Sequence, residues 1–358
     1  MRDALIDLLV CPPCQTALTV SGGTKNGPHV MSGELRCARC GARTPIVDGV
    51  PDFVCGVGDA TGAAQSGDAP NHGAPAGSRA HKSVEQTTSG FAMNWQRYSR
   101  VILAEPALND ELFRDWIAPV QPESFEGKAV LDAGCGMGRW LAAAAPHMPQ
   151  TLVGFDYSEV VHAAFDNTRH LKHVHVVRAD IFRLPFRRVF DACYSIGVVH
   201  HTPDPEGAFA ALLDAVVDDG ILAVWVYGKE NNAWIETVVS PLRRLFTSRL
   251  PDTALLVLTK VLTLQLAAAA HGYARAFPAP TTFPYDAYAR HLLKYPRPYL
   301  EHIVYDHLVP QLAQYLPREE LEAWATKRGL TYSLTSRNAN SWRLITARSV
   351  SALDAFTT

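Results

Sequence analysis

The chain has 358 residues, which is more than one hydrophobic core usually organises, so two or three domains are expected. Apolar residues make up 47% and charged residues 19%, a globular balance that excludes a largely disordered chain. The formal net charge of −2 excludes the strongly basic composition that is typical of proteins that bind duplex nucleic acid or anionic membranes.

The N-terminus contains no apolar core of a signal peptide. Residues 1–10 include one arginine and two aspartates, and a cysteine follows at position 11. The most apolar stretch, Leu255 to Ala270, is interrupted by Lys260 and is shorter than the ~20 residues that cross a bilayer. We therefore expect a cytoplasmic protein with no membrane span, and we interpret this stretch as a buried helix or a cap helix.

Seven cysteines are present, and four of them form two CxxC pairs. In a reducing cytoplasm, such pairs indicate a metal site rather than disulfides. Each CxxC turn brings two thiolates to one ion at about 2.3 Å, and two turns complete a tetrahedral site that has no open position for a substrate. The sequence therefore predicts a structural zinc with the ligands Cys11, Cys14, Cys37 and Cys40. Cys55 is expected to be a free thiol.

The stretches Leu8–Leu18 and Gly33–Phe53 surround these pairs. They resemble the zinc-ribbon activator subunit of eukaryotic RNA and protein methyltransferases, a ribbon that bacteria often fuse to the methyltransferase itself. The resemblance implies a zinc ribbon at residues 1–55. Residues 56–88 are mostly small or polar, so we expect a flexible linker that makes the ribbon a separate domain.

From about Lys128, short apolar runs alternate with helical patterns, which is typical of a parallel sheet flanked by helices. The sequence predicts an α/β core at residues 89–228. The expected strands are Ala129–Ala133, Thr151–Phe155, His173–Arg178, Phe190–Ser195 and Ile221–Tyr227. Residues 317–350 are expected to complete a seven-stranded sheet with a helix and a closing hairpin, at Pro317–Leu330, Thr331–Ser336 and Ser341–Thr346.

The first expected strand runs into a glycine-rich turn, Asp132-Ala-Gly-Cys-Gly-Met-Gly138, that opens a helix. The glycines allow a ligand to approach the backbone, but the pattern alone also fits a dinucleotide or phosphate loop. Asp132 distinguishes these ligands, because a carboxylate ahead of the glycines repels a pyrophosphate and suits a cation. The cation that we expect carries an amino group and a sulfonium.

Acidic residues also end the next two expected strands. Asp156 can accept hydrogen bonds from both hydroxyls of a ribose, and Asp180 can accept one from an adenine amino group. The carboxylates at 132, 156 and 180 are expected to face one crevice. For each position taken alone, the alternative is the ordinary abundance of Asp where strands end and helices begin.

Positions 129–228 resemble class I S-adenosylmethionine-dependent methyltransferases, particularly the ubiquinone and menaquinone biosynthesis enzymes. The matching segments are VLDAGCGMGRW, VGFDYSEVV, VRADIFRLPF, FDACYSIGVVHHTPDPEGAF and DDGILAVWVYG. The resemblance implies a Rossmann-like fold with S-adenosylmethionine as the cofactor. Upstream, Phe91–Tyr98 resembles an aromatic helix that folds over the cofactor in ribbon-fused bacterial members. The implied cofactor-binding residues are Trp95, Asp132, Gly134, Cys135, Gly136, Gly138, Asp156, Tyr157, Asp180, Ile181, Gly197 and Val199.

Methyl transfer from a sulfonium is an in-line displacement, and alignment of the two reactants can supply most of the catalysis. A base is needed only where the acceptor atom carries a proton. His200 and His201 follow the fourth expected strand at the crevice and are the candidate catalytic residues. A purely structural role is the alternative for either histidine.

Residues 229–316 separate the fifth expected strand from the C-terminal helix, and simple connections are far shorter. They are rich in Tyr, His, Pro and Leu, so we expect a helical cap over the acceptor pocket. His302 and Asp306 would share one helical face, where cap packing is favoured over a metal pair.

Three functional hypotheses follow. The aromatic cap and the neutral charge favour a methyltransferase that acts on a small molecule, such as a metabolite, sugar or natural product, without a nucleic-acid partner. The first alternative is an RNA methyltransferase that recognises its substrate through the zinc ribbon, although acidic residues match the basic ones of the ribbon. The second is a non-catalytic cofactor-binding protein that stabilises a partner. The sequence gives no oligomeric state.

Overall fold

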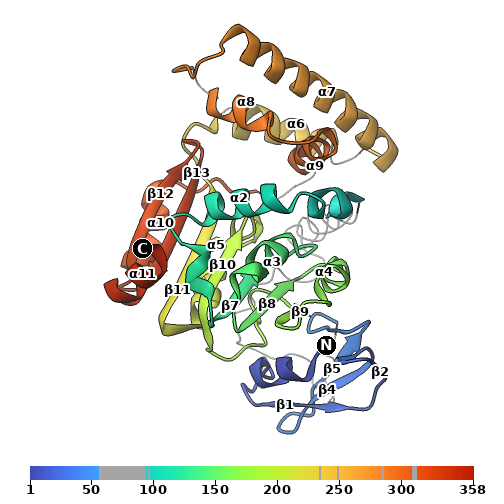
Figure 1. The fold of residues 1–358 in the computed structure, drawn as a ribbon. Helices are drawn as coiled ribbons and strands as arrows, with labels where there is room; N and C mark the ends of the chain where they lie inside the picture. Colours follow the sequence, from blue (N-terminus) through green and yellow to red (C-terminus); the bar gives the residue numbers. More distant parts are fainter. Residues whose placement is uncertain (56–93, 96, 234, 248–249, 284–285, 309–312) are drawn as a thin grey trace.

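The computed structural model describes residues 1–55, 94–95, 97–233, 235–247, 250–283, 286–308 and 313–358. Figure 1 shows three parts in succession: small strands near the N-terminus at one end, a large sheet with helices in the middle, and a group of helices from residues 235–308 at the other end. The expected linker, residues 56–88, lies outside the described residues.

The N-terminal part, residues 1–55, is called the ribbon below. Its elements are a 3-10 helix (Asp3–Leu8), a sheet in the order β1 (Leu18–Ser21), β4 (Gly33–Cys37), β5 (Arg43–Val47) and β6 (Val50–Pro51), and a short pair of β2 (Lys25–Asn26) and β3 (His29–Val30). Alternate residues of β4 and β5 are buried, so one face of the sheet is apolar. This face adjoins the large domain, since Leu5 and Leu35 belong to the same hydrophobic cluster as Phe155.

The large domain contains a seven-stranded sheet. The strand order is β12 (Thr331–Arg337), β13 (Ser341–Ala347), β11 (Val216–Tyr227), β10 (Phe190–Ile196), β7 (Ala129–Ala133), β8 (Thr151–Asp156) and β9 (Val174–Arg178). Strands β7 to β11 are parallel, and β13 pairs antiparallel with β11. The predicted Rossmann-like fold is therefore confirmed. The order reverses between β7 and β10, which places a crevice at the carboxyl ends of these two strands.

Helices cover both faces of this sheet (Figure 1). One face packs against α2 (Pro106–Ile117), α3 (Arg139–Ala144), α4 (Val161–Thr168) and α11 (Val350–Thr357). The other face packs against α5 (Pro205–Asp214), α10 (Arg318–Thr326) and the ribbon. The parallel strands are buried almost throughout because helices exclude water from both faces, which explains their continuous apolar runs.

Strand β11 begins at Val216, earlier than the expected Ile221. Its pairing with β10 shifts register between Phe190 and Ala192, so the strand continues through an irregularity that the apolar pattern does not reveal. Gly220 suits this place, because an added Cβ would lie 2.5 Å from the carbonyl oxygen of Asp191.

Arg178, the last residue of β9, connects the ribbon to the half of the large domain that contains β7, β8 and β9. This half is called the cofactor half below, because the glycine-rich turn and the three aspartates lie at the carboxyl ends of these strands. The Phe53 amide donates to the Arg178 carbonyl at 2.9 Å, and Asp52 forms a parallel bridge with the same residue. The Arg178 guanidinium donates to the Asp52 carboxylate at 3.0 Å and to the Tyr157 carbonyl at 3.0 Å. One arginine side chain thus contacts both the ribbon and the residue that follows Asp156.

Replacing Arg178 by Gln is expected to lower the free energy of unfolding by about 2 to 3 kcal/mol, because the Asp52 carboxylate, only 6% exposed, then lacks its charged partner. Urea unfolding followed by tryptophan fluorescence measures the change. Arg169→Gln is the matched control, since Arg169 is 49% exposed and pairs with Asp166 at the surface. An equal loss in both variants would argue against a joining role for Arg178.

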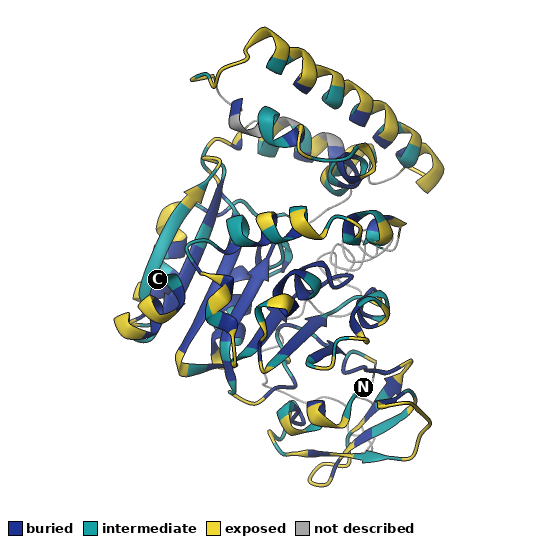
Figure 2. Ribbon diagram, in the orientation of Figure 1, coloured by how far each residue is buried: buried dark blue, intermediate teal, exposed yellow. Residues whose placement is uncertain are grey.

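The segment predicted as a cap contains five helices among its described residues. They are a π-helix (Ile235–Val239), α6 (Ser240–Leu245), α7 (Asp252–Ala276), α8 (Asp286–Leu292) and α9 (Arg297–Leu308). The 25 residues of α7 exceed the expected apolar stretch, and by length and composition alone this helix could cross a membrane. The helix packs on α8 and α9, and only 22% of its most apolar window is buried (Figure 2). Of the two interpretations of this stretch, a buried helix or a cap helix, the structure therefore shows the cap helix.

Candidate active site

The glycine turn after β7 has the backbone conformation that its sequence predicts. Gly134, Gly136 and Gly138 have φ of +80°, +53° and +85°, a region that other residues rarely adopt. A Cβ at Gly134 would lie 2.2 Å from a methyl group of Val198, so the turn also packs closely on the segment after β10. The turn therefore lies at the switch point of the sheet, with its backbone open to a ligand.

Asp132 is the penultimate residue of β7, and its carboxylate is fully buried. Neither carboxylate oxygen has a hydrogen-bond partner among the described residues. Burial, together with the nearby Asp156, raises the pKa of Asp132 well above its ordinary value, and the neighbouring Tyr194 hydroxyl opposes only part of this rise. A buried carboxylate without a partner is costly, and an ammonium group of a ligand would satisfy it. This carboxylate therefore fits the amino group of S-adenosylmethionine.

Asp156 and Asp180 are held by local hydrogen bonds at the ends of β8 and β9. The Asp156 carboxylate accepts from the Gly136 amide at 3.0 Å and from the Ser158 amide and hydroxyl at 2.9 and 2.7 Å. The Asp180 carboxylate accepts from the Phe182 amide at 3.0 Å. Burial is the largest influence on both groups and raises the pKa of each, while these hydrogen bonds oppose the rise. These hydrogen bonds hold the two carboxylates at the cavity, beside the ends of the neighbouring strands β8 and β9, and their contacts with ribose and adenine stay predictions.

A cavity of approximately 1220 Å³ opens from the glycine turn toward the cap. Its walls include most of the predicted cofactor residues, namely Trp95, Gly134, Cys135, Gly136, Asp156, Tyr157, Asp180, Ile181 and Gly197. Asp132 is fully buried, and Gly138 packs against Ala164. Val199 is also fully buried and does not line the cavity, because the turn after β10 directs Val198 there instead. The individual cofactor contacts of the predicted residues stay predictions.

The two candidate catalytic histidines have different positions. His201 lines the cavity, whereas His200 is fully buried beneath it, with its ring 4.1 Å from that of Tyr227. Burial holds the pKa of His200 well below its ordinary value, so its imidazole is neutral. The position of His200 fits the alternative of a purely structural role. His201 alone therefore stays a predicted catalytic residue.

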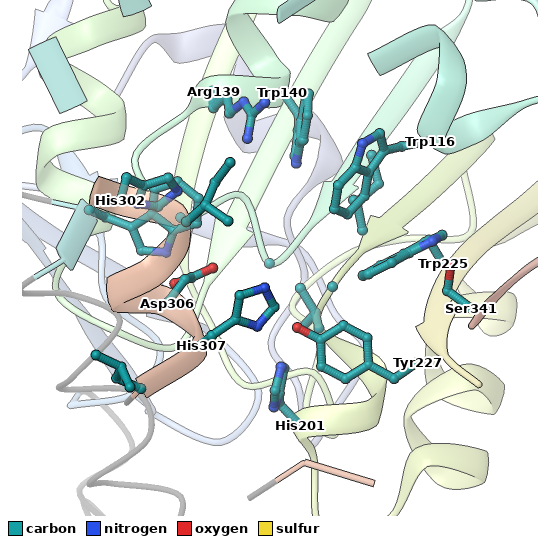
Figure 3. Close-up of a pocket in the computed structure, with 18 of the residues that line it drawn as sticks. Trp116, Arg139, Trp140, His201, Trp225, Tyr227, His302, Asp306, His307 and Ser341 are labelled. Carbon is teal, nitrogen blue, oxygen red and sulfur yellow. The ribbon is translucent and has the colours of Figure 1, made fainter. Parts of the chain in front are cut away.

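The part of the cavity beyond the glycine turn is aromatic (Figure 3). Trp116 and Trp225 lie with ring centroids 4.2 Å apart, and Trp116 and Trp140 lie 5.9 Å apart. Tyr227 and Tyr315 stack at 5.6 Å. These side chains come from α2, α3, β11 and the residues before α10, which only the tertiary fold brings together. Trp140, Trp225 and Tyr227 lie in the segments that resemble the methyltransferase family, but no pattern in the sequence marked them as one group.

Two buried arginines in the cavity wall form no salt bridge with the described residues, although Asp306 across the same cavity attracts the charge of Arg139. Arg139 donates to the Asn109 side-chain oxygen at 3.1 Å and lies 3.9 Å from the ring centroid of Trp140. Arg243 donates to the Ser240 hydroxyl at 3.1 Å and to the His307 carbonyl at 3.3 Å, and its Nε has no partner. They are 7% and 6% exposed. Because neither guanidinium is in a salt bridge, both can receive an anionic group of a ligand.

Asp306 of α9 also lines the cavity and accepts from the Asn94 side-chain amide at 2.9 Å. Burial raises the pKa of Asp306 from 3.8 to about 7. The folded protein therefore holds this proton more tightly than the unfolded chain, and stability that is present below about pH 4 is lost as pH rises to about 7.

We expect Asp306→Asn to remove this part of the pH dependence of Tm, as measured by scanning calorimetry at several pH values. Exposed Asp354→Asn is the control, and unchanged pH dependence in both variants would contradict the assignment.

The four cysteines of the ribbon form the metal site that the sequence predicts. Their sulfur atoms lie within 4.8 Å of one another, with Cys11 3.8 Å from Cys14 and 3.6 Å from Cys40, and Cys14 3.9 Å from Cys37. Four sulfurs about 2.3 Å from a tetrahedral zinc would be about 3.8 Å apart. The site therefore fits a structural zinc. Among the described residues this is the only group of three or more potential ligands that lie close enough to share an ion, and His302 and Asp306 are not part of it.

Two known sequence families match the chain. Residues 131–224 match the family described as "Methyltransferase domain", and residues 2–49 match the family described as "Trm112p-like protein". The fold, the glycine turn and the three carboxylates thus define a class I S-adenosylmethionine-dependent methyltransferase domain. The chain joins this domain to an N-terminal zinc ribbon of the Trm112p-like type, as its sequence predicts.

Curated relatives carry the name tRNA U34 carboxymethyltransferase. The one from Psychromonas ingrahamii is 33% identical over 110 residues, which cover 29% of this chain and 34% of that protein. The one from Pseudoalteromonas translucida is 31% identical over 121 residues, covering 32% and 38%. The chain therefore spans little more than a third of the length of these relatives. Among solved structures, magnesium protoporphyrin IX methyltransferase from Synechocystis PCC 6803 is 15% identical, with a TM-score of 0.43 over 75% of this chain and 100% of that one.

The expectation of a small-molecule acceptor without a nucleic-acid partner is wrong, because these curated relatives are named for modification of tRNA. That expectation depended on the aromatic cap and on a net charge summed over the whole chain. A single base can enter a cavity of aromatic and arginine side chains without an extended basic surface. The near-neutral charge was therefore no argument against RNA.

Proposed function

We propose that the protein is an S-adenosylmethionine-dependent RNA methyltransferase, with a base of tRNA as the acceptor. The supporting observation is the aromatic cavity that continues from the glycine turn and carries two buried arginines that form no salt bridge with the described residues. Enzymes that modify a base take it out of its stack and hold it between aromatic side chains. The arginines would receive a phosphate of the same nucleotide.

Catalysis on this proposal depends mainly on position. Bound S-adenosylmethionine supplies a methyl group that is already activated for transfer. Asp132 holds the amino end of the cofactor, and Asp156 holds its ribose. Trp116 and Trp225 confine the acceptor base, so its reacting atom is aligned with the methyl group. His201 lies four residues after Gly197, lines the same cavity, and accepts a proton at its imidazole where the acceptor atom carries one.

The RNA would enter from the cap side of the cavity. The ribbon lies at the opposite end of the large domain (Figure 1), and its contacts are with β9 and the cofactor half. Substrate recognition through the ribbon, part of the alternative considered from sequence, thus has less support than recognition by the cap. A tRNA substrate is met in the cytoplasm, which is the location that we propose.

The test is transfer of labelled methyl groups to unmodified tRNA, followed by digestion to nucleosides and mass spectrometry. We expect a labelled nucleoside with the wild type and none with Asp132→Asn. Arg243→Gln is expected to raise KM for tRNA about tenfold or more while the Kd for S-adenosylmethionine is unchanged. Arg297→Gln, which changes a 58% exposed arginine on α9, is the control. A folded, cofactor-binding protein that methylates no RNA from any pool would overturn the proposal.

A further inference from the structure

Trp95 packs on the glycine turn, where the methionine end of the cofactor is expected. An added Cβ at Gly136 would lie 3.6 Å from the Trp95 ring, so the indole covers the bare side of this glycine. Gly136 is tied to a predicted cofactor residue, because its amide donates to the Asp156 carboxylate at 3.0 Å. Trp95 also lines the cavity. A cofactor bound at the turn would therefore lie against the Trp95 side chain.

The ring of Trp95 is in contact with the cap. Its centroid lies 4.5 Å from that of His302 on α9, and the two planes are inclined by 49°. The ring of Tyr98 lies 5.9 Å from the same imidazole. His302 is 3% exposed, and burial, together with the nearby Arg139, lowers its pKa to about 3. The imidazole is therefore neutral, and its contact with Trp95 is the packing of two uncharged rings rather than a cation–π interaction.

The residue before Trp95 forms a hydrogen bond with the same cap helix. Asn94 has no exposed surface, and its side-chain amide donates to the Asp306 carboxylate at 2.9 Å. Asp306 lies one turn after His302 on α9, and Figure 3 shows both side chains at the cavity. A hydrogen bond depends on direction, whereas apolar packing tolerates small displacements. The two contacts together therefore fix the position of Trp95 relative to α9, although Asn94 and Asp306 are 212 residues apart in the chain.

We propose that His302 and Asp306 are positioning residues for S-adenosylmethionine, which act by holding Trp95 and Asn94 so that the indole covers the glycine turn. The turn and the three aspartates belong to the large domain, and the cap would supply the support for the remaining wall of the cofactor site. A side chain that is already in place when the ligand arrives does not have to be ordered on binding, which raises affinity. By linkage, bound cofactor would in turn stabilise the position of α9.

Two other roles for these α9 residues lead to different results. If His302 and Asp306 only stabilise the cap, their replacement lowers Tm and leaves the affinity for S-adenosylmethionine unchanged. If they contact the cofactor themselves, their replacement weakens binding whether or not Trp95 is present. Only the positioning role makes the loss of affinity depend on Trp95.

Isothermal titration calorimetry with S-adenosylmethionine tests the proposal on the full-length, zinc-loaded protein without RNA. We expect His302→Leu to raise the Kd about tenfold, and His302→Phe, which keeps a ring against Trp95, to stay within about twofold of the wild type. Asp306→Leu is expected to raise the Kd by a similar factor. Asp306→Asn is expected to restore most of the affinity, because it keeps an oxygen that accepts from Asn94. Arg297→Gln, which changes a 58% exposed arginine on the same helix, is the control.

A double variant shows whether the effect passes through Trp95. Trp95→Leu is expected to raise the Kd at least as much as His302→Leu, and the double variant is expected to differ from Trp95→Leu by less than about twofold. If the two effects multiply instead, His302 acts independently of Trp95 and the proposal is overturned. It is also overturned if His302→Leu and Asp306→Leu lower Tm and leave the Kd unchanged.

Hydrogen exchange followed by mass spectrometry gives a second measurement, which compares each variant with and without cofactor and so does not require equal stability. Saturating S-adenosylmethionine is expected to increase the protection of α9 in the wild type and not in Trp95→Leu. Unchanged protection of α9 in the wild type would contradict the proposal. Because no RNA is present, these outcomes are independent of the proposed function.

Discussion

Replacing Asp132 by Asn is expected to weaken the binding of S-adenosylmethionine by about a hundredfold or more, because the amino group of the cofactor then loses its buried counter-charge. The same change is expected to raise Tm of the cofactor-free protein. In that state both carboxylate oxygens lack hydrogen-bond partners, and burial together with Asp156 opposes ionisation. A lower affinity for the cofactor together with a higher Tm of the cofactor-free protein is expected of a side chain that binds the ligand but destabilises the empty fold.

Isothermal titration calorimetry and scanning calorimetry measure the two effects on the same samples. Asp166→Asn is the matched control, because Asp166 of α4 is 68% exposed and makes only a surface ion pair. It should change neither quantity appreciably. If Asp132→Asn binds the cofactor as tightly as the wild type, Asp132 does not face the ammonium group and the assignment of the glycine turn fails.

The parallel strands could be predicted from sequence because helices bury both of their faces. Each strand is then a continuous apolar run that ends at a polar residue, and β7 has the predicted bounds, Ala129–Ala133. The glycine turn and its carboxylates follow directly from those strand ends. By contrast, α2 was not predicted, although it has a proline in its first turn and buries Leu112, Phe113 and Ile117 at helical spacing.

The acceptor half of the site could not be predicted in the same way. Trp116, Trp225 and Arg243 come from three elements that only the tertiary fold brings together. The choice between His200 and His201 depends on the phase of a single 3-10 turn, which no periodicity in the sequence reveals. A shift of this turn by one residue would exchange the two imidazoles, the one in the cavity and the one buried beneath it.

The relation of the ribbon to the large domain also depends on tertiary contacts. The sequence indicated a separate domain, whereas the structure shows apolar residues of the ribbon in one cluster with Phe155. The N-terminal amine of Met1 donates to the Val30 carbonyl at 3.0 Å, and burial lowers its pKa to about 5. An added Cβ at Gly49 would lie 2.5 Å from the Phe165 ring, so the ribbon and α4 are in close contact. A change in the ribbon is therefore transmitted to the cofactor half.

Zinc removal is expected to unfold the ribbon, lower Tm of the whole protein by about 10 °C and weaken the binding of S-adenosylmethionine. The ribbon is too small to fold without its metal, and its loss would expose the apolar surface around Phe155. It would also separate Arg178 from Asp52, and so release the arginine that holds the carbonyl of Tyr157, the residue after Asp156.

Metal analysis should find one zinc per chain, and the Cys14→Ser variant should lose that zinc together with protection of residues 1–55 from proteolysis. Cys55→Ser is the control, because Cys55 is exposed and stands outside the four-cysteine cluster. Restored cofactor affinity on return of zinc to the chelated wild type would show that the metal acts through the fold of the ribbon. A chelated protein that keeps a folded ribbon would refute the four-thiolate site, whereas a disordered ribbon with unchanged cofactor affinity would refute only the link through Arg178.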